Sequence, residues 1–308
     1  MRRLALLSLA VLLAGCGGDR GGSSDTGGTD SGLSGRIQID GSSTVAPYAT
    51  AAAEGFRRDN PGVDITVGVS GTGGGFERFC RGETDISDAS RTIEDDETAA
   101  CKEQGIDEVE IQVANDALTV VANPENDWAN CLTVAQLKTI WDTGSKVKSW
   151  KDVDPSFPDV ELKLYGPGTD SGTFDYFTKE INGEEGQSRS DYAASEDDNV
   201  IVQGVSGDEG ALGYFGLSYY EQNKDKLKAV AIDGGDGCVE PSIDTAQSGT
   251  YTPLSRPLFM YANAEALTRP EVKAFLQYVL DNEREIAQQA QFVPLTDEQL
   301  QQAKDALG

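Results

Sequence analysis

The sequence contains no histidine among its 308 residues. This absence excludes hydrolase mechanisms of the Ser-His-Asp and Cys-His kinds, because both use an imidazole as the general base. It also argues against a zinc site, since the chain lacks a Cys-x-x-Cys pair as well and so has few of the usual ligands. These absences remove two hydrolase mechanisms and weaken the case for zinc; our expectation for the chain is no enzyme, no catalytic residue, no metal and no cofactor.

Basic residues are scarce. The 25 Lys and Arg residues are outnumbered by 52 Asp and Glu residues, which gives a formal net charge of -27 and a pI near 4.2. Nucleic acids and anionic lipid surfaces both attract basic faces, so neither is an expected partner. The acidic excess is most simply a solvated surface, whose charges are screened beyond ~8–10 Å at ordinary salt.

Long apolar runs are confined to the N-terminus. Two arginines follow Met1, and residues 4–14 are apolar but too few to span a bilayer. The run ends in Leu-Ala-Gly-Cys, which resembles a bacterial lipobox with Cys16 as the lipidated residue; an ordinary secretory signal is the alternative. We expect residues 1–16 to be a lipoprotein signal peptide and residues 17–35, rich in Gly, Ser, Asp and Thr, to be a flexible tether. The protein would then lie outside the cytoplasm, held at the cell membrane by its lipid anchor alone.

The five cysteines fit this compartment. If Cys16 carries lipid, four remain, and an even number in an oxidising environment favours two disulfides. Three pairings are open. We favour Cys80–Cys101, which closes a short local segment, and Cys131–Cys238, which brackets one continuous block of chain.

A strand, a turn rich in Gly, Ser and Thr, and a helix follow one another three times in residues 36–308, a length that suits two modest domains. The predicted strands span residues 36–40, 64–69 and 161–165. The turns after them are Gly41–Thr44, Ser70–Gly75 and Gly166–Thr173. This order of elements is typical of the α/β class.

Each of these turns has the chemistry of an anion site. The first N–H groups of a helix have no partner within the helix, and the helix dipole places partial positive charge there. Glycine lets the backbone approach a ligand, and Ser or Thr adds a hydroxyl donor. The alternative is that a residue such as Ser43 or Ser171 only caps its helix. No turn ends in Gly-Lys-Ser/Thr, which argues against a nucleotide-binding P-loop.

Four motifs occur in order along the chain: residues 40–45 (DGSSTV), 70–75 (SGTGGG), 85–91 (DISDASR) and 166–174 (GPGTDSGTF). Residues 198–200 and 210–215 add to the match. Together they resemble the phosphate-binding lipoproteins of Pst-type ABC transporters, members of the periplasmic-binding-protein-like superfamily. The resemblance covers essentially all of residues 36–308.

The resemblance implies a type II periplasmic-binding-protein fold, in which two α/β domains enclose a ligand cleft at a hinge crossed twice by the chain. Domain I would comprise residues 36–115 and 256–308, with the C-terminal helices Pro270–Asp281 and Thr296–Leu307 packed on it. Domain II would comprise residues 116–255. The function implied is the capture of inorganic phosphate and its delivery to the permease subunits of an ABC importer; we expect a monomer.

The resemblance also assigns ligand residues. The donors would be Ser43, Thr44, Ser70, Gly71, Ser171, Gly172 and Thr173. Asp88 would accept the proton that hydrogen phosphate carries and sulfate lacks, unless it is a surface or capping aspartate. Many relatives carry an arginine where this chain has Pro167, and we expect Arg91 to replace it, with a structural salt bridge as the alternative.

Other functions stay open. The ligand could be sulfate, molybdate or arsenate, although an acceptor at Asp88 favours the protonated anions phosphate and arsenate. The protein could also sense phosphate without transporting it. A phosphatase would need a nucleophile beside a base or a metal cluster, and the sequence offers no candidate beyond scattered aspartates.

Overall fold

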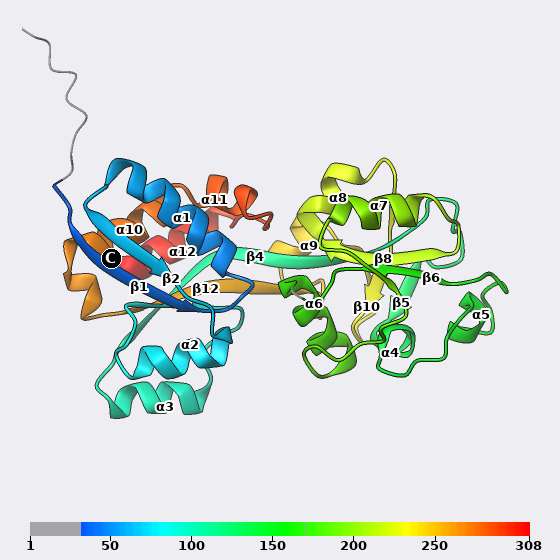
Figure 1. Ribbon diagram of the computed structural model, residues 1–308, viewed down its shortest axis with the longest axis horizontal. Coiled ribbons are helices and arrows are strands. Elements are labelled where there is room, and N and C mark those ends of the chain that lie inside the picture. Colours follow the sequence, from blue (N-terminus) through cyan, green and yellow to red (C-terminus); the bar gives the residue numbers. More distant parts are fainter. Residues whose placement is uncertain (1–31, 170) are drawn as a thin grey trace, which may run out of the picture.

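The computed structural model describes residues 32–169 and 171–308. The expected signal peptide, Cys16 and most of the expected tether lie outside the described residues. Figure 1 shows two lobes joined by two long strands, β4 (Glu108–Ala122) and β12 (Ser255–Asn263).

The first lobe contains both ends of the described chain. Its strands are β1 (Gly35–Gly41), β2 (Val63–Val67) and β3 (Ile86–Ala89), with β1 parallel to both neighbours. Its helices are α1 (Ala46–Asp59), α2 (Gly71–Cys80), α3 (Asp95–Glu103), the short 3-10 helix η2 (Ala266–Thr268), α10 (Pro270–Asp281), α11 (Glu283–Gln289) and α12 (Asp297–Leu307).

The second lobe is formed by the middle of the chain. Its strands are β5 (Cys131–Thr133), β6 (Lys163–Gly166), β7 (Ala193–Ala194), β8 (Ala211–Gly216), β9 (Lys228–Ala229), β10 (Ala231–Asp233) and β11 (Cys238–Val239). Its helices are α4 (Val134–Trp141), α5 (Trp150–Val153), α6 (Gly172–Phe177), which runs on into the π-helix η1 (Thr178–Asn182), α7 (Asp198–Ser206), α8 (Leu217–Asn223) and α9 (Ile243–Gln247).

One sheet runs through both lobes. Within the described residues its strand order is β2-β1-β3-β12-β4-β8-β6-β7, with β9 also paired to β4. The first part of β4 pairs with β12, and its last five residues pair with β8. Arg256 of β12 pairs with Asp116 of β4, so the predicted domain boundaries fall on paired positions of the two crossing strands. The boundaries themselves stay a prediction.

Each lobe has its own hydrophobic core. In the first lobe α1 buries its alanine-rich face, and Phe56 meets Phe275 of α10 edge to face with ring centroids 5.6 Å apart. In the second lobe Trp141 and Trp150 are fully buried, and Phe177 stacks on the ring of Tyr214. Two separate cores allow each lobe to move as a unit about the strands that join them.

Both favoured disulfides are confirmed. Cys80–Cys101 joins α2 to α3 in the first lobe, and Cys131–Cys238 joins β5 to β11 in the second. The predicted C-terminal helices are present as α10 and α12, while α11 between them was not predicted.

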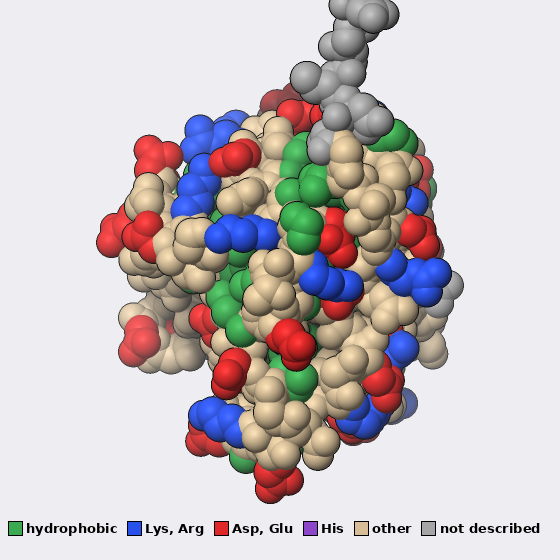
Figure 2. Space-filling model, turned by 90° about the vertical axis from the view of Figure 1, so that its left-hand side faces the viewer, with side chains coloured by type: hydrophobic (Ala, Val, Ile, Leu, Met, Phe, Trp, Pro, Cys, Tyr) green, Lys and Arg blue, Asp and Glu red, His purple; other side chains and the backbone are tan. Residues whose placement is uncertain are grey.

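The surface carries charges of both signs. Figure 2 shows the end of the first lobe, where acidic and basic side chains are interspersed around a narrow apolar strip. In the part of the chain that the structure describes, no helix is both long and apolar enough to cross a membrane.

Candidate functional site

A cavity of about 670 Å³ opens between the lobes. From the first lobe it is lined by the turn before α1, the start of α2 and residues 90–92. From the second lobe it is lined by α6 and η1, and the segment 252–257 leading into β12 closes one side. A smaller hollow of about 170 Å³ adjoins it, since Ser43 and Thr44 line both.

Two of the three predicted turns reach the large cavity. Ser43 and Thr44 follow β1, and Ser70 and Gly71 follow β2; because these strands are parallel, their carboxyl ends meet at one edge of the sheet. Gly71 has a φ of +78°, a conformation that favours glycine, and α2 begins there. The N-terminal N–H groups of α2 therefore start at the cavity, where the helix dipole favours negative charge.

The third predicted turn meets the first lobe at Thr44. A Cβ added to Gly172 would lie 3.2 Å from Thr44 Oγ1, so the start of α6 packs closely against that turn. Gly172 and Thr173 line the smaller hollow, together with Asp116 and other residues. Ser171 lines neither hollow; its Oγ accepts the Thr173 N–H at 3.2 Å and so caps α6.

Asp88 is not at the cavity. It lies in β3 between Gly41 of β1 and Met260 of β12, is fully buried, and lines neither hollow. Among the described residues neither of its carboxylate oxygens has a hydrogen-bond partner. Burial, and then the nearby charge of Asp40, raise the pKa of Asp88 well above its usual value. The structure therefore does not bring the predicted proton acceptor to the cavity.

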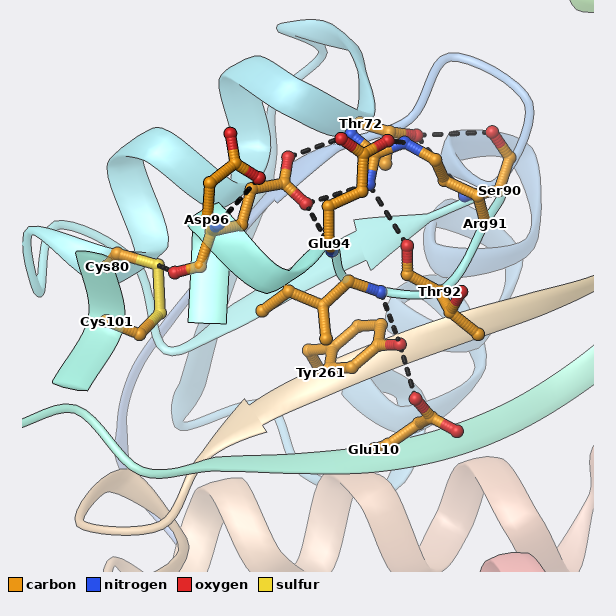
Figure 3. A network of polar contacts seen from close by, with 12 residues as sticks. Thr72, Cys80, Ser90, Arg91, Thr92, Glu94, Asp96, Cys101, Glu110 and Tyr261 are labelled. Atoms are coloured by element: carbon orange, nitrogen blue, oxygen red, sulfur yellow. Dashed lines mark hydrogen bonds and ion pairs between the residues drawn. A yellow bond between two sulfur atoms is a disulfide. The ribbon is translucent and has the colours of Figure 1, made fainter. Parts of the chain in front are cut away.

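Arg91 lines the cavity but is already paired. Its two terminal nitrogens each donate to one carboxylate oxygen of Glu97 at 2.8 Å, and its Nε lies 3.3 Å from Glu94 (Figure 3). This is the arrangement that the salt-bridge alternative describes. A contact between Arg91 and a ligand stays a prediction.

Arg256 is the main residue that the sequence analysis missed. Its Nη2 donates to Thr44 Oγ1 at 2.9 Å, its Nε donates to Asp116 at 3.2 Å, and its guanidinium lies 3.5 Å from the centre of the Tyr176 ring. It lines the large cavity from the hinge. No local motif marks it, because its position depends on the pairing of β12 with a strand 140 residues earlier in the chain.

Two hydroxyl residues of the cavity were also missed. Thr72 Oγ1 lies 3.1 Å from Ser90 Oγ and accepts the Ser90 N–H at 3.2 Å, which joins α2 to the segment after β3 (Figure 3). Both lie within motifs that the sequence analysis had singled out, residues 70–75 and 85–91, so their place in those motifs was a usable signal.

Charges of the two signs balance around the cavity. The basic residues that line it are Arg91, Lys179 and Arg256, and the acidic ones are Asp175, Glu180 and Glu185. The local balance is thus even, although the whole chain is strongly acidic. In the described ranges no three His, Cys, Asp or Glu side chains are grouped so that they could hold a metal ion.

Comparisons with known proteins identify similar chains. The profile of the PBP superfamily domain matches residues 23–283. The chain is 48% identical over 262 residues to the protein SphX of Synechococcus elongatus, covering 84% of this chain and 77% of that one. It is 42% identical over 291 residues to the phosphate-binding protein PstS of Staphylococcus saprophyticus, covering 94% and 88%. The crystal structure of a possible phosphate binding protein from Planctomyces limnophilus superposes with a TM-score of 0.86 at 47% identity, covering 89% and 98%.

Proposed function

Because the chain belongs to the PBP superfamily, and within it to the family of the PstS phosphate-binding proteins, we propose that it captures inorganic phosphate for an ABC importer. The type II fold predicted from the sequence is confirmed: two α/β lobes flank a cavity and are joined by two strands. The observation that carries the proposal is the cavity itself, in which hydroxyl groups from two turns meet a guanidinium from the hinge.

The expected ligand residues stay a proposal. Ser43, Thr44, Ser70 and Gly71 are available at the large cavity, and Gly172 and Thr173 at the hollow beside it. Gly172 already lies against Thr44, and the cavity has more room than a single small anion needs, so we propose that the lobes close further on phosphate. Ser171 would then act mainly by holding the start of α6 in place.

Arg256 is our candidate for the cation that this chain lacks at Pro167. A guanidinium offers five N–H donors in a fixed plane, which suits an oxyanion. Two of its nitrogens are held by Asp116 and Thr44, while the structure gives Nη1 no hydrogen-bond partner among the described residues. Arg91 is the second candidate, and its guanidinium would have to bind phosphate in addition to its ion pair with Glu97.

The setting of the protein is also proposed. We infer from the sequence that residues 1–16 form a lipoprotein signal peptide and its lipobox, that cleavage removes residues 1–15, and that Cys16 becomes the lipidated N-terminus outside the cytoplasm. Residues 17–35 would give the receptor its reach toward the permease subunits, to which it would deliver phosphate as a monomer. We expect no turnover, since the PstS relative is named as a phosphate-binding protein.

The test is calorimetric titration of residues 17–308, stripped of endogenous ligand, with phosphate, arsenate, sulfate and molybdate. Saturable one-to-one binding of phosphate with no hydrolysis of a phosphate ester supports the proposal. Binding of sulfate or molybdate in preference would reassign the anion. Hydrolysis of the ester would reassign the class of protein.

A further inference from the structure

The segment between α11 and α12, residues 290–296, lies beside β4 at the hinge; we call it the strap. Val293 exchanges two backbone hydrogen bonds with Asn115 of β4, each 2.9 Å long. The Leu295 N–H donates to Glu283 Oε1 of α11 at 2.7 Å. Since both flanking helices belong to the first lobe, the strap is fixed to that lobe.

Hydrogen bonds join the strap and α12 to the second lobe. Gln247 is the last residue of α9, and its Nε2 donates to the carbonyl of Pro294 at 2.7 Å. Gln299 of α12 donates from Nε2 to the carbonyl of Gln247 at 3.3 Å. The end of α9 is therefore bonded to two elements of the first lobe.

An apolar contact adds to these hydrogen bonds. Val293 is buried in a small cluster with Leu217 at the start of α8 and Ala246 of α9. Because α8 and α9 belong to the second lobe, this cluster excludes water from the space between the lobes. All of these contacts are noncovalent, so a rotation of one lobe against the other can break them.

The strap and the large cavity lie on different sides of the crossing strands. Asn115 of β4 pairs with Pro257 of β12 on one edge and with Val293 of the strap on the other. Residues 252–257, which lead into β12, line the cavity. Figure 1 shows the same order, with α2 and α6 on the β12 side of the crossing and α9 and α11 on the β4 side.

A rotation at the crossing strands that brings α6 toward α2 carries α9 away from the strap. The hydrogen bond from Gln247 to Pro294 then lengthens, and water reaches the cluster around Val293. Both changes cost free energy. The open form is stabilised by the same amount, and the apparent affinity of a ligand that needs the closed form falls with the fraction of closed protein.

We propose that the strap holds the lobes apart and thereby weakens phosphate binding from outside the site. The inference rests on the proposed function, in which phosphate is the ligand that closes the lobes. Gln247 and Val293 then lower the affinity without touching the anion, since neither lines the large cavity or the hollow beside it.

The experiment measures the Kd for phosphate by calorimetry for residues 17–308 and for the variants Q247A and V293A. Q247A should bind phosphate about 2- to 10-fold more tightly, the factor that corresponds to one neutral hydrogen bond. V293A should also bind more tightly, although the loss of buried apolar surface lowers its melting temperature. A residue whose role is only structural would not give tighter binding together with lower stability.

The matched control is Q301A. Gln301 lies on α12, and its Nε2 donates to Asp305 of the same helix at 2.8 Å, so this hydrogen bond does not join the lobes. Q301A should leave the Kd unchanged. If Q247A and V293A bound phosphate no more tightly than the wild type, the inference would be overturned and the proposed function would stand.

A measurement without any anion separates the inference from the proposed function. In small-angle scattering the double variant Q247A/V293A should have a smaller radius of gyration than the wild type, because the closed form becomes more populated. A wild type that binds no phosphate would overturn the proposed function. Scattering would then decide the inference alone, and an unchanged radius of gyration in the double variant would overturn it.

Discussion

Arg256 Nη2 donates a hydrogen bond to the hydroxyl of Thr44 at 2.9 Å, and this contact ties the hinge strand β12 to the turn after β1. The same guanidinium lies on the ring of Tyr176, which belongs to α6 in the second lobe, and bonds to Asp116 on β4. One side chain thus contacts both lobes and both crossing strands. Binding of a ligand to this guanidinium and a change in the angle between the lobes would therefore affect each other.

The first prediction concerns that cation. R256Q should weaken phosphate binding by about 10- to 100-fold, because a charge-assisted hydrogen bond contributes about 1.5–3 kcal/mol. R256K should recover part of the loss at most, since an ammonium cannot bond Asp116 and Thr44 in one plane. Calorimetric Kd values decide the question.

The matched control for Arg256 is R284Q. Arg284 is also an arginine in an ion pair, but its side chain is 65% exposed and its partner Asp297 is almost fully exposed. It should leave the Kd for phosphate unchanged. Equal Kd values for R256Q and the wild type would mean that Arg256 does not substitute for the arginine absent at Pro167. Arg91 would then be the next candidate.

The second prediction concerns the disulfides. Replacing Cys131 and Cys238 together by serine should lower the free energy of unfolding by about 2–4 kcal/mol, because this bridge closes 107 residues of chain. Replacing Cys80 and Cys101 should cost less, since that bridge closes only 21 residues. Denaturant unfolding of the two double variants gives the comparison. A larger loss for the shorter loop would show that packing around each bridge outweighs chain entropy.

The structure shows which parts of the site could be predicted from the sequence and which could not. The hydroxyl-rich turns after β1 and β2 were predictable, because strand, turn and helix signals are local and parallel strands bring their carboxyl ends together. Arg256 was not predictable in this way, since its role depends on a strand pairing between distant segments. Asp88 is the reverse case: its motif was found, but β3 lies between β1 and β12 and the side chain is buried away from the cavity, so its role as proton acceptor stays a prediction. Whether a residue of a motif faces the cavity depends on which strands flank its own strand in the sheet.

The third prediction is a dependence of stability on pH. Glu283 is 1% exposed; its Oε1 accepts the Leu295 N–H at 2.7 Å, while its Oε2 has no partner among the described residues. Burial raises the pKa of Glu283 from 4.5 to about 7. A carboxyl whose pKa is raised by folding stabilises the folded state fully below about pH 4.5, and this contribution is lost as the pH rises through about 7.

E283Q keeps the shape of the side chain without its charge. At pH 8 it should unfold at a higher temperature than the wild type, by on the order of 1 kcal/mol or about 2–4 °C, and at pH 5 the two should be nearly equal. Thermal unfolding at both pH values measures the difference. A stabilisation of the same size at both pH values would point to packing rather than to the buried charge.

The last prediction tests how α2 is seated at the cavity. A Cβ on Gly75 would lie 2.6 Å from Gly41 Cα and 2.9 Å from Ser87 Oγ, so α2 rests directly on the backbone of β1. G75A should push the helix away, lower the free energy of unfolding by about 1–3 kcal/mol, and weaken phosphate binding through the displaced start of α2. Thermal unfolding and titration of the same sample separate the two effects.

G73A is the matched control for that helix. A Cβ on Gly73 would come no closer than 3.8 Å to a neighbour, and alanine has the higher helix propensity. It should therefore keep or raise the melting temperature. If G75A were as stable as G73A and bound phosphate as the wild type does, the contact between α2 and β1 would not position the binding turn. In that case the turn would be held by the hydrogen bonds of Ser70, from its Oγ to Asp40 and from its N–H to the Gly41 carbonyl.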